Sequence, residues 1–412
     1  MEKRDGYYFN YEYSDKFNGT KICLVFTREA KKEDFSYGGV LKSLLRRDNS
    51  VYKTLREVKI AKEELLIDLL AIKQRTFGNV YQLMINVAFP NEKFAEQDLS
   101  SNALKFIETI LLKPKLVNGY FDKNQVDKLK REKILAIDSI KDDPHDYASL
   151  DFDKKFDPEG PISFSPLGEK EIYEEMDEKK LYDFYKSLLN DFRLEAYVVG
   201  DCSKEVIAGE IDKVFAGRKP KVDKLDVISS SKLVKKDISE YVIPYNTKQS
   251  VLHMGFVFDN LTERERLFVS RVFTLILDGP AGKLFKILRE KHSLCYGVRV
   301  TNYSYNDKYI IGTSISASNY EKTRKLILEI LNSMKKGDFD IEMGAAKNRI
   351  ITSILEREDS LGALINERIF ENLTKELTVD EEISSIKSVT KEEVINYAKK
   401  MNLDTIHFLK ED

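Results

Sequence analysis

The sequence is poor in the residues that hold metal ions and disulfides. Three cysteines occur in 412 residues, and they are far apart with no C-x-x-C spacing: Cys23, Cys202 and Cys295. An odd, sparse set of this kind argues against a disulfide framework and against a cysteine-based zinc site. No apolar run approaches the ~18 residues needed to span a bilayer, and the N-terminal residues lack the apolar segment of a signal peptide. We therefore expect a cytoplasmic protein without a membrane span.

Histidine is equally scarce, and the four residues are His145, His253, His292 and His407. No two of them lie within five residues, so no helix carries H-E-x-x-H or H-x-x-E-H. His253 lies on the strand face opposite Leu252, which predicts a solvent-facing or hydrogen-bonded ring, and His407 is interpreted as a strand residue without a special role. His145 lies among three aspartates. These suit a divalent cation or, as the favoured interpretation, a helix start.

Motifs for other chemistries are also missing. The sequence contains no G-x-S-x-G and no S-x-x-K with a supporting set, which argues against a serine nucleophile. The stretch DGPAG (278–282) precedes a helix and could present backbone N–H groups to an anion, although a plain turn is the favoured interpretation. Lysine and arginine (67) nearly balance aspartate and glutamate (69). This balance argues against a nucleic-acid binder.

A faint internal repeat divides the chain. In segments 103–144 and 323–359, an apolar-periodic helix ends in a polar turn that contains Phe-Asp, and a second helix rich in lysine and arginine follows. The elements around these segments also correspond, with period-2 patterns typical of half-buried strands. The corresponding pairs are strands 21–26 and 251–258, helices 33–46 and 262–277, strands 81–89 and 308–316, and closing strands 194–200 and 405–410.

Runs of strands and runs of helices without strict βαβ alternation favour an α+β fold. We therefore predict two homologous halves, residues 1–217 and 238–412, each an antiparallel sheet covered by helices. The segment 218–237 between them is rich in lysine, serine and aspartate and has no sustained period. This composition is typical of a solvated linker.

The segment LFKILREKHSLCYGVRV (284–300) combines a helix, a short polar turn and an alternating strand. Its apolar residues predict ordinary core packing. Arg289 ends the helix and Tyr296 begins the strand, so a guanidinium and a phenol could point at one spot. Both groups donate hydrogen bonds to a peptide carbonyl or a developing oxyanion. From the spacing alone, a surface arginine and a strand aromatic are the favoured interpretation, and a site stays open.

The same stretch, extended to residues 275–298, resembles the second-half signature of the pitrilysin/insulinase family of inverted-motif zinc peptidases. That signature is a glycine-containing turn followed by SRLF, LREK and LxYxV. The resemblance implies duplicated α+β halves over essentially the whole chain. It also implies that Arg289 and Tyr296, which match the family's arginine and tyrosine, assist substrate and transition-state binding.

The chain departs from that family at the metal. Active members carry H-x-x-E-H on the first helix of the first half and a distant glutamate as the third zinc ligand. The corresponding stretch here, SYGGVLKSLL (36–45), has no histidine, glutamate or aspartate. Where the third ligand is expected, KILAID (133–138) places Ile137, and the neighbouring Asp138 cannot replace a three-ligand set. The resemblance therefore implies no metal, no cofactor and no catalytic residue on this chain alone.

Two main hypotheses follow from the resemblance. In the first, the chain is the non-catalytic, substrate-binding subunit of a heteromeric bacterial zinc metallopeptidase that acts on peptides. A zinc-bearing paralogous subunit completes the dimer, and Arg289 and Tyr296 reach into a shared cavity. In the second, the chain is a non-enzymatic peptide-binding or scaffolding protein of the same family. An enzyme with unrelated chemistry is a weaker third hypothesis, because the motifs for it are absent.

Overall fold

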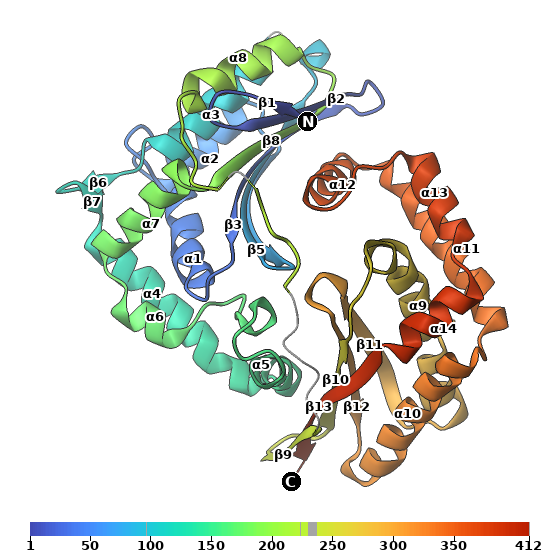
Figure 1. Cartoon of the computed structure of the whole chain (residues 1–412). Helices are drawn as coiled ribbons and strands as arrows, with labels where there is room; N and C mark the ends of the chain where they lie inside the picture. Colours follow the sequence, from blue (N-terminus) through green and yellow to red (C-terminus); the bar gives the residue numbers. More distant parts are fainter. Residues whose placement is uncertain (96, 223, 230–236, 412) are drawn as a thin grey trace. The chain divides into compact units, whose positions relative to one another are not determined.

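The computed structural model describes residues 1–95, 97–222, 224–229 and 237–411 (Figure 1). The chain folds into two compact units. Unit 1 comprises Met1–Asp138, Phe164–Val227 and Glu358–Glu376, and unit 2 comprises Ser139–Ser163, Ile228–Arg357 and Leu377–Asp412. No helix in the described part of the chain is long and apolar enough to cross a membrane.

Unit 1 is built on a six-stranded sheet. Its strands in spatial order are β1 (Glu2–Lys3), β2 (Tyr8–Tyr13), β8 (Arg193–Gly200), β3 (Gly19–Glu29), β5 (Val80–Pro90) and β4 (Leu69–Phe77). A short hairpin, β6 (Leu116–Val117) and β7 (Tyr120–Phe121), lies outside this sheet. The helices of the unit are α1 (Asp34–Leu45), α2 (Leu55–Glu64), α3 (Leu99–Leu112), α4 (Lys123–Asp138), α6 (Lys170–Glu175), α7 (Glu178–Asn190), α8 (Lys204–Phe215) and α12 (Leu361–Leu373).

Unit 2 is built on a five-stranded sheet. Its strands in spatial order are β11 (Cys295–Tyr303), β12 (Lys308–Ile315), β10 (Ser250–Phe258), β13 (Met401–Glu411) and β9 (Ser239–Tyr245). The helices are α5 (Pro144–Phe156), α9 (Ser270–Leu277), α10 (Tyr320–Lys336), α11 (Asp340–Arg357), α13 (Val379–Ser388) and α14 (Lys391–Lys399), with π-helical turns at Glu265–Val269 and Phe285–Lys291. Short 3-10 turns lie at Glu92–Phe94, Ser139–Asp142, Pro161–Ser163, Ser304–Asn306 and Ala317–Asn319.

The two sheets share one topology, which confirms the predicted α+β fold with two homologous halves. In unit 1, β2 pairs in parallel with β8, and β8, β3, β5 and β4 then follow in antiparallel pairs. In unit 2, β9 pairs in parallel with β13, and β13, β10, β12 and β11 follow in the same way. The repeated Phe-Asp turns also correspond, since Phe121 and Phe339 are both buried where α4 and α11 begin.

The structure adds elements that the predicted order of strands and helices did not include, although the sequence indicated a helix start at His145, where α5 begins. The parallel outer strands β2 and β9 are absent from the predicted order. Between the repeat helices and the closing strand, three further helices occur in each half of the sequence. They are α5, α6 and α7 in the first half, and α12, α13 and α14 in the second.

The first helix of each added set belongs to the opposite unit. Helix α5 packs on β10 and β13 of unit 2, whereas α12 packs on β8 and β3 of unit 1. The compact units therefore differ from a simple division of the sequence. The half boundaries 1–217 and 238–412 and the linker 218–237 remain predictions, and residues 230–236 of that linker lie outside the described residues.

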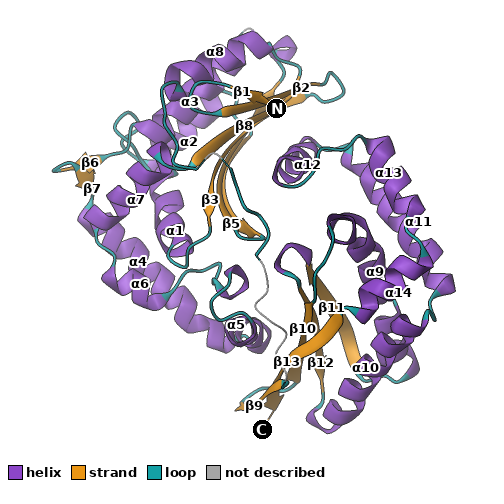
Figure 2. Ribbon diagram, in the orientation of Figure 1, coloured by secondary structure: helices purple, strands orange, loops and turns teal. Residues whose placement is uncertain are grey.

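The apolar face of each sheet faces its own helices, as Figure 2 shows for the strands and the helices beside them. In β3, Ile22, Leu24 and Phe26 alternate into the large core of unit 1, which also contains apolar residues of α1, α3, α7 and α8. This alternation is the period-2 pattern expected of a strand. The opposite face of the sheet carries buried apolar residues such as Cys23 and Val25 as well as the buried Glu195, and α12 covers part of it.

A buried carboxylate, that of Glu195, joins α12 to this second face of the sheet. Glu195 of β8 is fully buried, and its carboxylate accepts hydrogen bonds from Arg193 Nε (2.6 Å), Tyr197 OH (3.0 Å) and Asn372 Nδ2 (2.6 Å) of α12. Each donor satisfies a lone pair that would otherwise be desolvated without a partner. The network therefore determines where α12 can sit on the sheet.

We expect Glu195→Ala to lower the free energy of unfolding by about 3 kcal/mol, because it leaves the buried Arg193 without its carboxylate. Glu195→Gln keeps the shape and one acceptor and should have a smaller effect. Urea unfolding measures the difference. As a control, Asp183→Ala removes an exposed ion pair with Lys186 (2.8 Å) and should change stability by at most about 0.5 kcal/mol. Equal effects of Glu195→Ala and Asp183→Ala would contradict this account.

Candidate functional site

The predicted pair, Arg289 and Tyr296, lies at a helix–turn–strand corner of unit 2. Leu284 and Leu288 are buried and anchor the helix, while Arg289 is exposed on its last turn. The chain reverses through Ser293, whose φ of 49° lies in the left-handed region. Strand β11 then begins at Cys295. The helix and strand thus form the core packing that the sequence predicted, with the two polar side chains left outside it.

The corner brings the two side chains into contact. The Arg289 guanidinium lies 5.3 Å from the centroid of the Tyr296 ring, a cation–π distance. Its Nη1 also donates to the carbonyl oxygen of Cys295 (3.4 Å). Tyr296 is 81% exposed, and no ion pair in the described part of the chain involves Arg289. Most of the hydrogen-bonding capacity of the pair is therefore free for a ligand.

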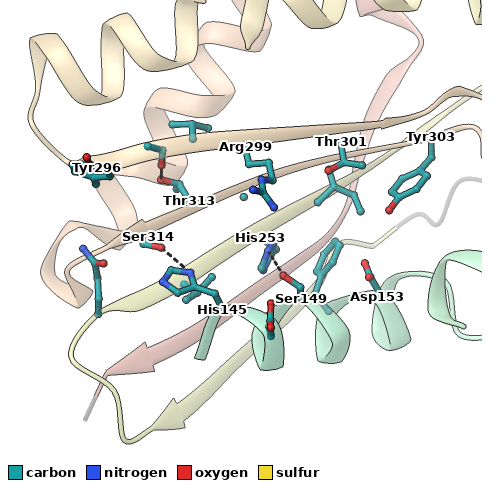
Figure 3. Close-up of a pocket in the computed structure, with 18 residues that line it drawn as sticks. His145, Ser149, Asp153, His253, Tyr296, Arg299, Thr301, Tyr303, Thr313 and Ser314 are labelled. Carbon is teal, nitrogen blue, oxygen red and sulfur yellow. Dashed lines mark hydrogen bonds between the residues drawn. The ribbon is translucent and has the colours of Figure 1, made fainter. Parts of the chain in front are cut away.

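A cavity of about 750 Å³ opens beside Tyr296, entirely within unit 2 (Figure 3). Strands β10, β12 and β11 form one wall and α5 forms the other. Tyr296 lines this cavity, whereas Arg289 does not. A β-bulge between Cys295 and Val298 moves Tyr296 and Gly297 out of the regular ladder, and the Thr313 hydroxyl donates to the freed Gly297 carbonyl (2.8 Å). The bulge therefore aims Tyr296 at the mouth of the cavity.

Four positions on neighbouring strands form one row across the sheet. His407 of β13 pairs with His253 of β10, His253 pairs with Gly312 of β12, and Gly312 pairs with Arg299 of β11. Residues directly opposite each other in a sheet project to the same face. Figure 3 shows His253 and Arg299 on the side of the strands that faces α5. Across the strands, the wall of the cavity thus presents the His253 imidazole, then Gly312 without a side chain, then the Arg299 guanidinium.

Contacts with helix α5 determine the burial and the hydrogen bonds of both histidines in this row. His407 is fully buried, with its Nε2 2.7 Å from the Asp151 carboxylate. Burial alone would raise the pKa of Asp151, but hydrogen bonds from His407 and Lys155 hold it below its ordinary value. His253 is half-buried rather than facing solvent. Its ring stacks on Phe152 at 5.2 Å, and its Nε2 lies 3.5 Å from the Ser149 hydroxyl.

The surroundings keep His253 neutral. Burial, reinforced by the nearby His407 and His145, lowers its pKa to about 3. At neutral pH the ring is therefore a polar group without charge. His145 lies at the start of α5, where the Asp143 side chain accepts its backbone N–H (2.8 Å). This geometry confirms the helix-start interpretation of the aspartate-rich segment.

Asp153 of α5 lines the same cavity and is half-buried. Burial, with the neighbouring charge of Asp157 as a smaller cause, raises its pKa to about 7. The folded protein therefore holds a proton that the unfolded chain, with a pKa of about 3.9, releases. Stability falls as the pH rises from about 4 to about 7, because ionised Asp153 is unfavourable in the folded state.

We expect Asp153→Asn to be more stable than the natural protein above pH 7, by roughly 1–2 kcal/mol after allowance for solvent screening. The difference should disappear as the pH falls towards 4, where the carboxyl group is protonated in both states. Thermal unfolding at several pH values measures it. Exposed Asp183→Asn is the control, and a stability gain for Asp153→Asn that is equal at pH 5 and pH 8 would contradict the assignment.

The first half has no room for a metal at the helix where active members of the family carry their zinc ligands. On α1, a Cβ at Gly38 would lie 2.1 Å from the Tyr81 hydroxyl, and a Cβ at Gly39 would lie 3.0 Å from the Tyr173 hydroxyl. These phenols fill the space beside the helix. Ile137 of α4 packs against the apolar core. The predicted absence of ligands at 36–45 and 133–138 thus coincides with a filled interior.

The charges in this region also oppose a cation. Burial lowers the pKa of Lys42 on α1, and the positive charges of Lys133 on α4 and Arg46 lower it further. A divalent ion would meet the same repulsion. Within the described residues, no group of three histidine, cysteine or acidic side chains could hold a metal.

We expect the purified chain to contain no stoichiometric zinc, because neither the ligands nor the space for them is present. Elemental analysis after expression in zinc-supplemented medium checks this. The double variant Lys42→Ala with Lys133→Ala removes the repulsion without adding ligands and should remain free of zinc. Zinc at one equivalent in the unmodified chain would overturn this description of the first half.

The sequence did not predict the cavity or Arg299. The alternation of residues 296–303 placed Arg299 on one face of its strand, but the register that sets it opposite Gly312 and His253 depends on three separate strands. Helix α5, which forms the other wall, was recognised only as a helix start. The sequence does not show which residues pair across neighbouring strands, and this pairing is what places Arg299 in the cavity.

The sequence and the fold are similar to those of inactive peptidases. Residues 175–343 match the family model described as "Peptidase M16 inactive domain". The chain is 23% identical over 403 residues to the "Probable inactive metalloprotease YmfF" of Bacillus subtilis (strain 168), and the match covers 96% of this chain and 94% of that protein.

Solved structures share the whole fold. A conserved protein from Enterococcus faecalis V583 superposes with a TM-score of 0.90 at 21% identity, over 98% of this chain and 96% of that chain. The peptidase M16 inactive domain from Pseudomonas fluorescens superposes with a TM-score of 0.78 at 17% identity, over 99% of this chain and 96% of that chain. At these identities the structural likeness concerns the fold alone.

Proposed function

We propose that this chain, which is similar to inactive peptidases of the M16 family, is the non-catalytic, substrate-binding subunit of a heteromeric zinc metallopeptidase. A paralogous subunit with an intact H-x-x-E-H motif supplies the zinc. The proposed substrate is a peptide, the assembly is a dimer, and its location is the cytoplasm. In this proposal Arg289 and Tyr296 reach into a cavity that this chain shares with the zinc-bearing subunit, where the peptide binds.

The observation that carries the proposal is the contrast between the two halves. The positions where zinc ligands would lie are filled by phenols and lysines, whereas Arg289 and Tyr296 are exposed, adjacent and beside a cavity. A pair that served only to pack the fold would be expected to bury more of its surface. Tyr296 instead leaves 81% of its surface exposed, which favours a role in ligand binding.

The chemistry of the pair suits a peptide. The guanidinium presents several fixed N–H donors, and the phenol presents one O–H donor. Both can stabilise a peptide carbonyl oxygen, and they can stabilise the negative charge that develops on this oxygen when water adds to it. In this scheme the chain itself holds no metal and activates no water. It binds and orients the peptide.

A second candidate is a non-enzymatic peptide-binding or scaffolding protein. The contact of Arg289 with the Tyr296 ring and the Cys295 carbonyl supports it, because the same contacts stabilise the corner in the absence of any partner. Under this candidate the two side chains affect peptide affinity but no reaction rate.

We expect Arg289→Ala and Tyr296→Phe each to lower kcat by about 10²-fold or more in a complex of this chain with a paralogue that carries H-x-x-E-H. The reason is the loss of one donor to the oxyanion. Hydrolysis of a fluorogenic peptide measures it for the pair and for each chain alone. Arg56→Ala, an exposed arginine on α2, is the matched control and should leave the rate unchanged.

Two outcomes would decide between the candidates. Activity of the complex that is indifferent to both substitutions would exclude the shared-cavity role and favour a scaffolding protein. Peptide hydrolysis by this chain alone would contradict both candidates.

A further inference from the structure

The floor of the cavity in unit 2 is open at one residue. Gly312 of β12 lies between His253 of β10 and Arg299 of β11 in the cross-strand row. Neighbouring strands are about 4.8 Å apart, so the backbones of His253 and Arg299 stand roughly 10 Å apart, and Gly312 itself places no side chain between them. This distance leaves space for one small polar group of a ligand.

The absence of a side chain at position 312 has a steric cause. A Cβ at Gly312 would lie 2.9 Å from Cδ2 and 3.1 Å from Nε2 of His253. Glycine therefore lets the imidazole lean over β12 towards the gap. The Ser149 hydroxyl, 3.5 Å from the same Nε2, holds the ring from the side of α5. One side of the gap thus presents a fixed, neutral polar surface.

The other side of the gap presents a free cation. Arg299 is exposed and lines the cavity, and within the described residues its guanidinium forms no hydrogen bond or ion pair. The two carboxyl groups of the lining, Asp146 and Asp153, both come from α5. Positive charge therefore lies on the strand wall and acidic groups lie on the helix wall. This arrangement orients a ligand that carries a carboxylate.

We propose that Arg299 binds a carboxylate of the bound peptide and holds it between the guanidinium and the His253 imidazole. The guanidinium fork matches the two oxygens of a carboxylate, and such charge-assisted hydrogen bonds are about twice as strong as neutral ones. The proposal rests on the proposed peptide-binding function and names the chemistry that the cavity selects. The carboxylate is that of a peptide C-terminus or of an aspartate or glutamate side chain.

The experiment uses the complete chain and three N-acetylated decapeptides with one tryptophan each. Because the chain contains no tryptophan, the fluorescence anisotropy of the peptide reports binding directly. The first peptide has a central aspartate and an amidated C-terminus. The second has asparagine in its place and is also amidated. The third has asparagine and a free C-terminal carboxylate.

We expect a peptide with a carboxylate to bind about ten- to a hundredfold more tightly than the amidated asparagine peptide. Arg299→Ala should abolish this preference, and Arg299→Lys should retain part of it because lysine keeps the charge but loses the fork. Arg56→Ala is the control and should retain the full preference. The first and third peptides together identify the source of the carboxylate.

Equal affinity of the natural chain for all three peptides would overturn the role of Arg299 while leaving peptide binding intact. An equal loss of affinity for all three peptides in Arg299→Ala would also overturn it, since the residue would then act without regard to the carboxylate. If none of the peptides binds, both this inference and the proposed peptide-binding function fail.

Discussion

Each sheet of this protein has a second face on which buried polar groups lie among apolar residues, and one helix from the other half of the sequence covers part of it. Glu195 accepts from Asn372 of α12 in unit 1, and His407 contacts Asp151 of α5 in unit 2. Buried polar groups are stable only when they are hydrogen-bonded. The helices therefore have to dock with specific polar contacts, which fixes their position more tightly than apolar packing alone would.

The position of the covering helix creates the site. Helix α5 makes most of its sheet contacts with β10 and β13, and its Phe152 and Phe156 also pack with Ile310 of β12 and Tyr303 of β11. The cavity lies between α5 and the strands β10, β12 and β11, and its lining comes from both the helix and the strands. The same arrangement desolvates His253 and Asp153. It lowers the pKa of His253 and raises the pKa of Asp153, so burial favours the neutral form of both groups. The exposed Arg299 guanidinium lines the same cavity.

The two halves share one fold but differ in the side chains at the two places where a site could form. In the first half, glycines on α1 accept two phenols, and lysines on α1 and α4 repel each other, so the interior is filled and unsuited to a cation. In the second half, the corner at Arg289 and Tyr296 keeps polar groups exposed beside a cavity. A division of labour between halves, or between subunits, requires only such local changes because the core patterns that build the sheets are kept.

The sequence by itself determined the central strands of both sheets, the internal repeat, and the helix–turn–strand corner at residues 284–300. The period-2 patterns of β3, β5, β10 and β12 and the duplicated Phe-Asp turns were visible because they depend on neighbours a few residues apart. The missing metal ligands and the pair of Arg289 and Tyr296 were singled out by the resemblance to a family signature, which can be read from the sequence alone. Only the tertiary structure decided the exchange of α5 and α12, the parallel outer strands and the row from His407 to Arg299. These features depend on register and on contacts between separate elements, such as His253 with His407 and Glu195 with Asn372, and no local pattern records such contacts.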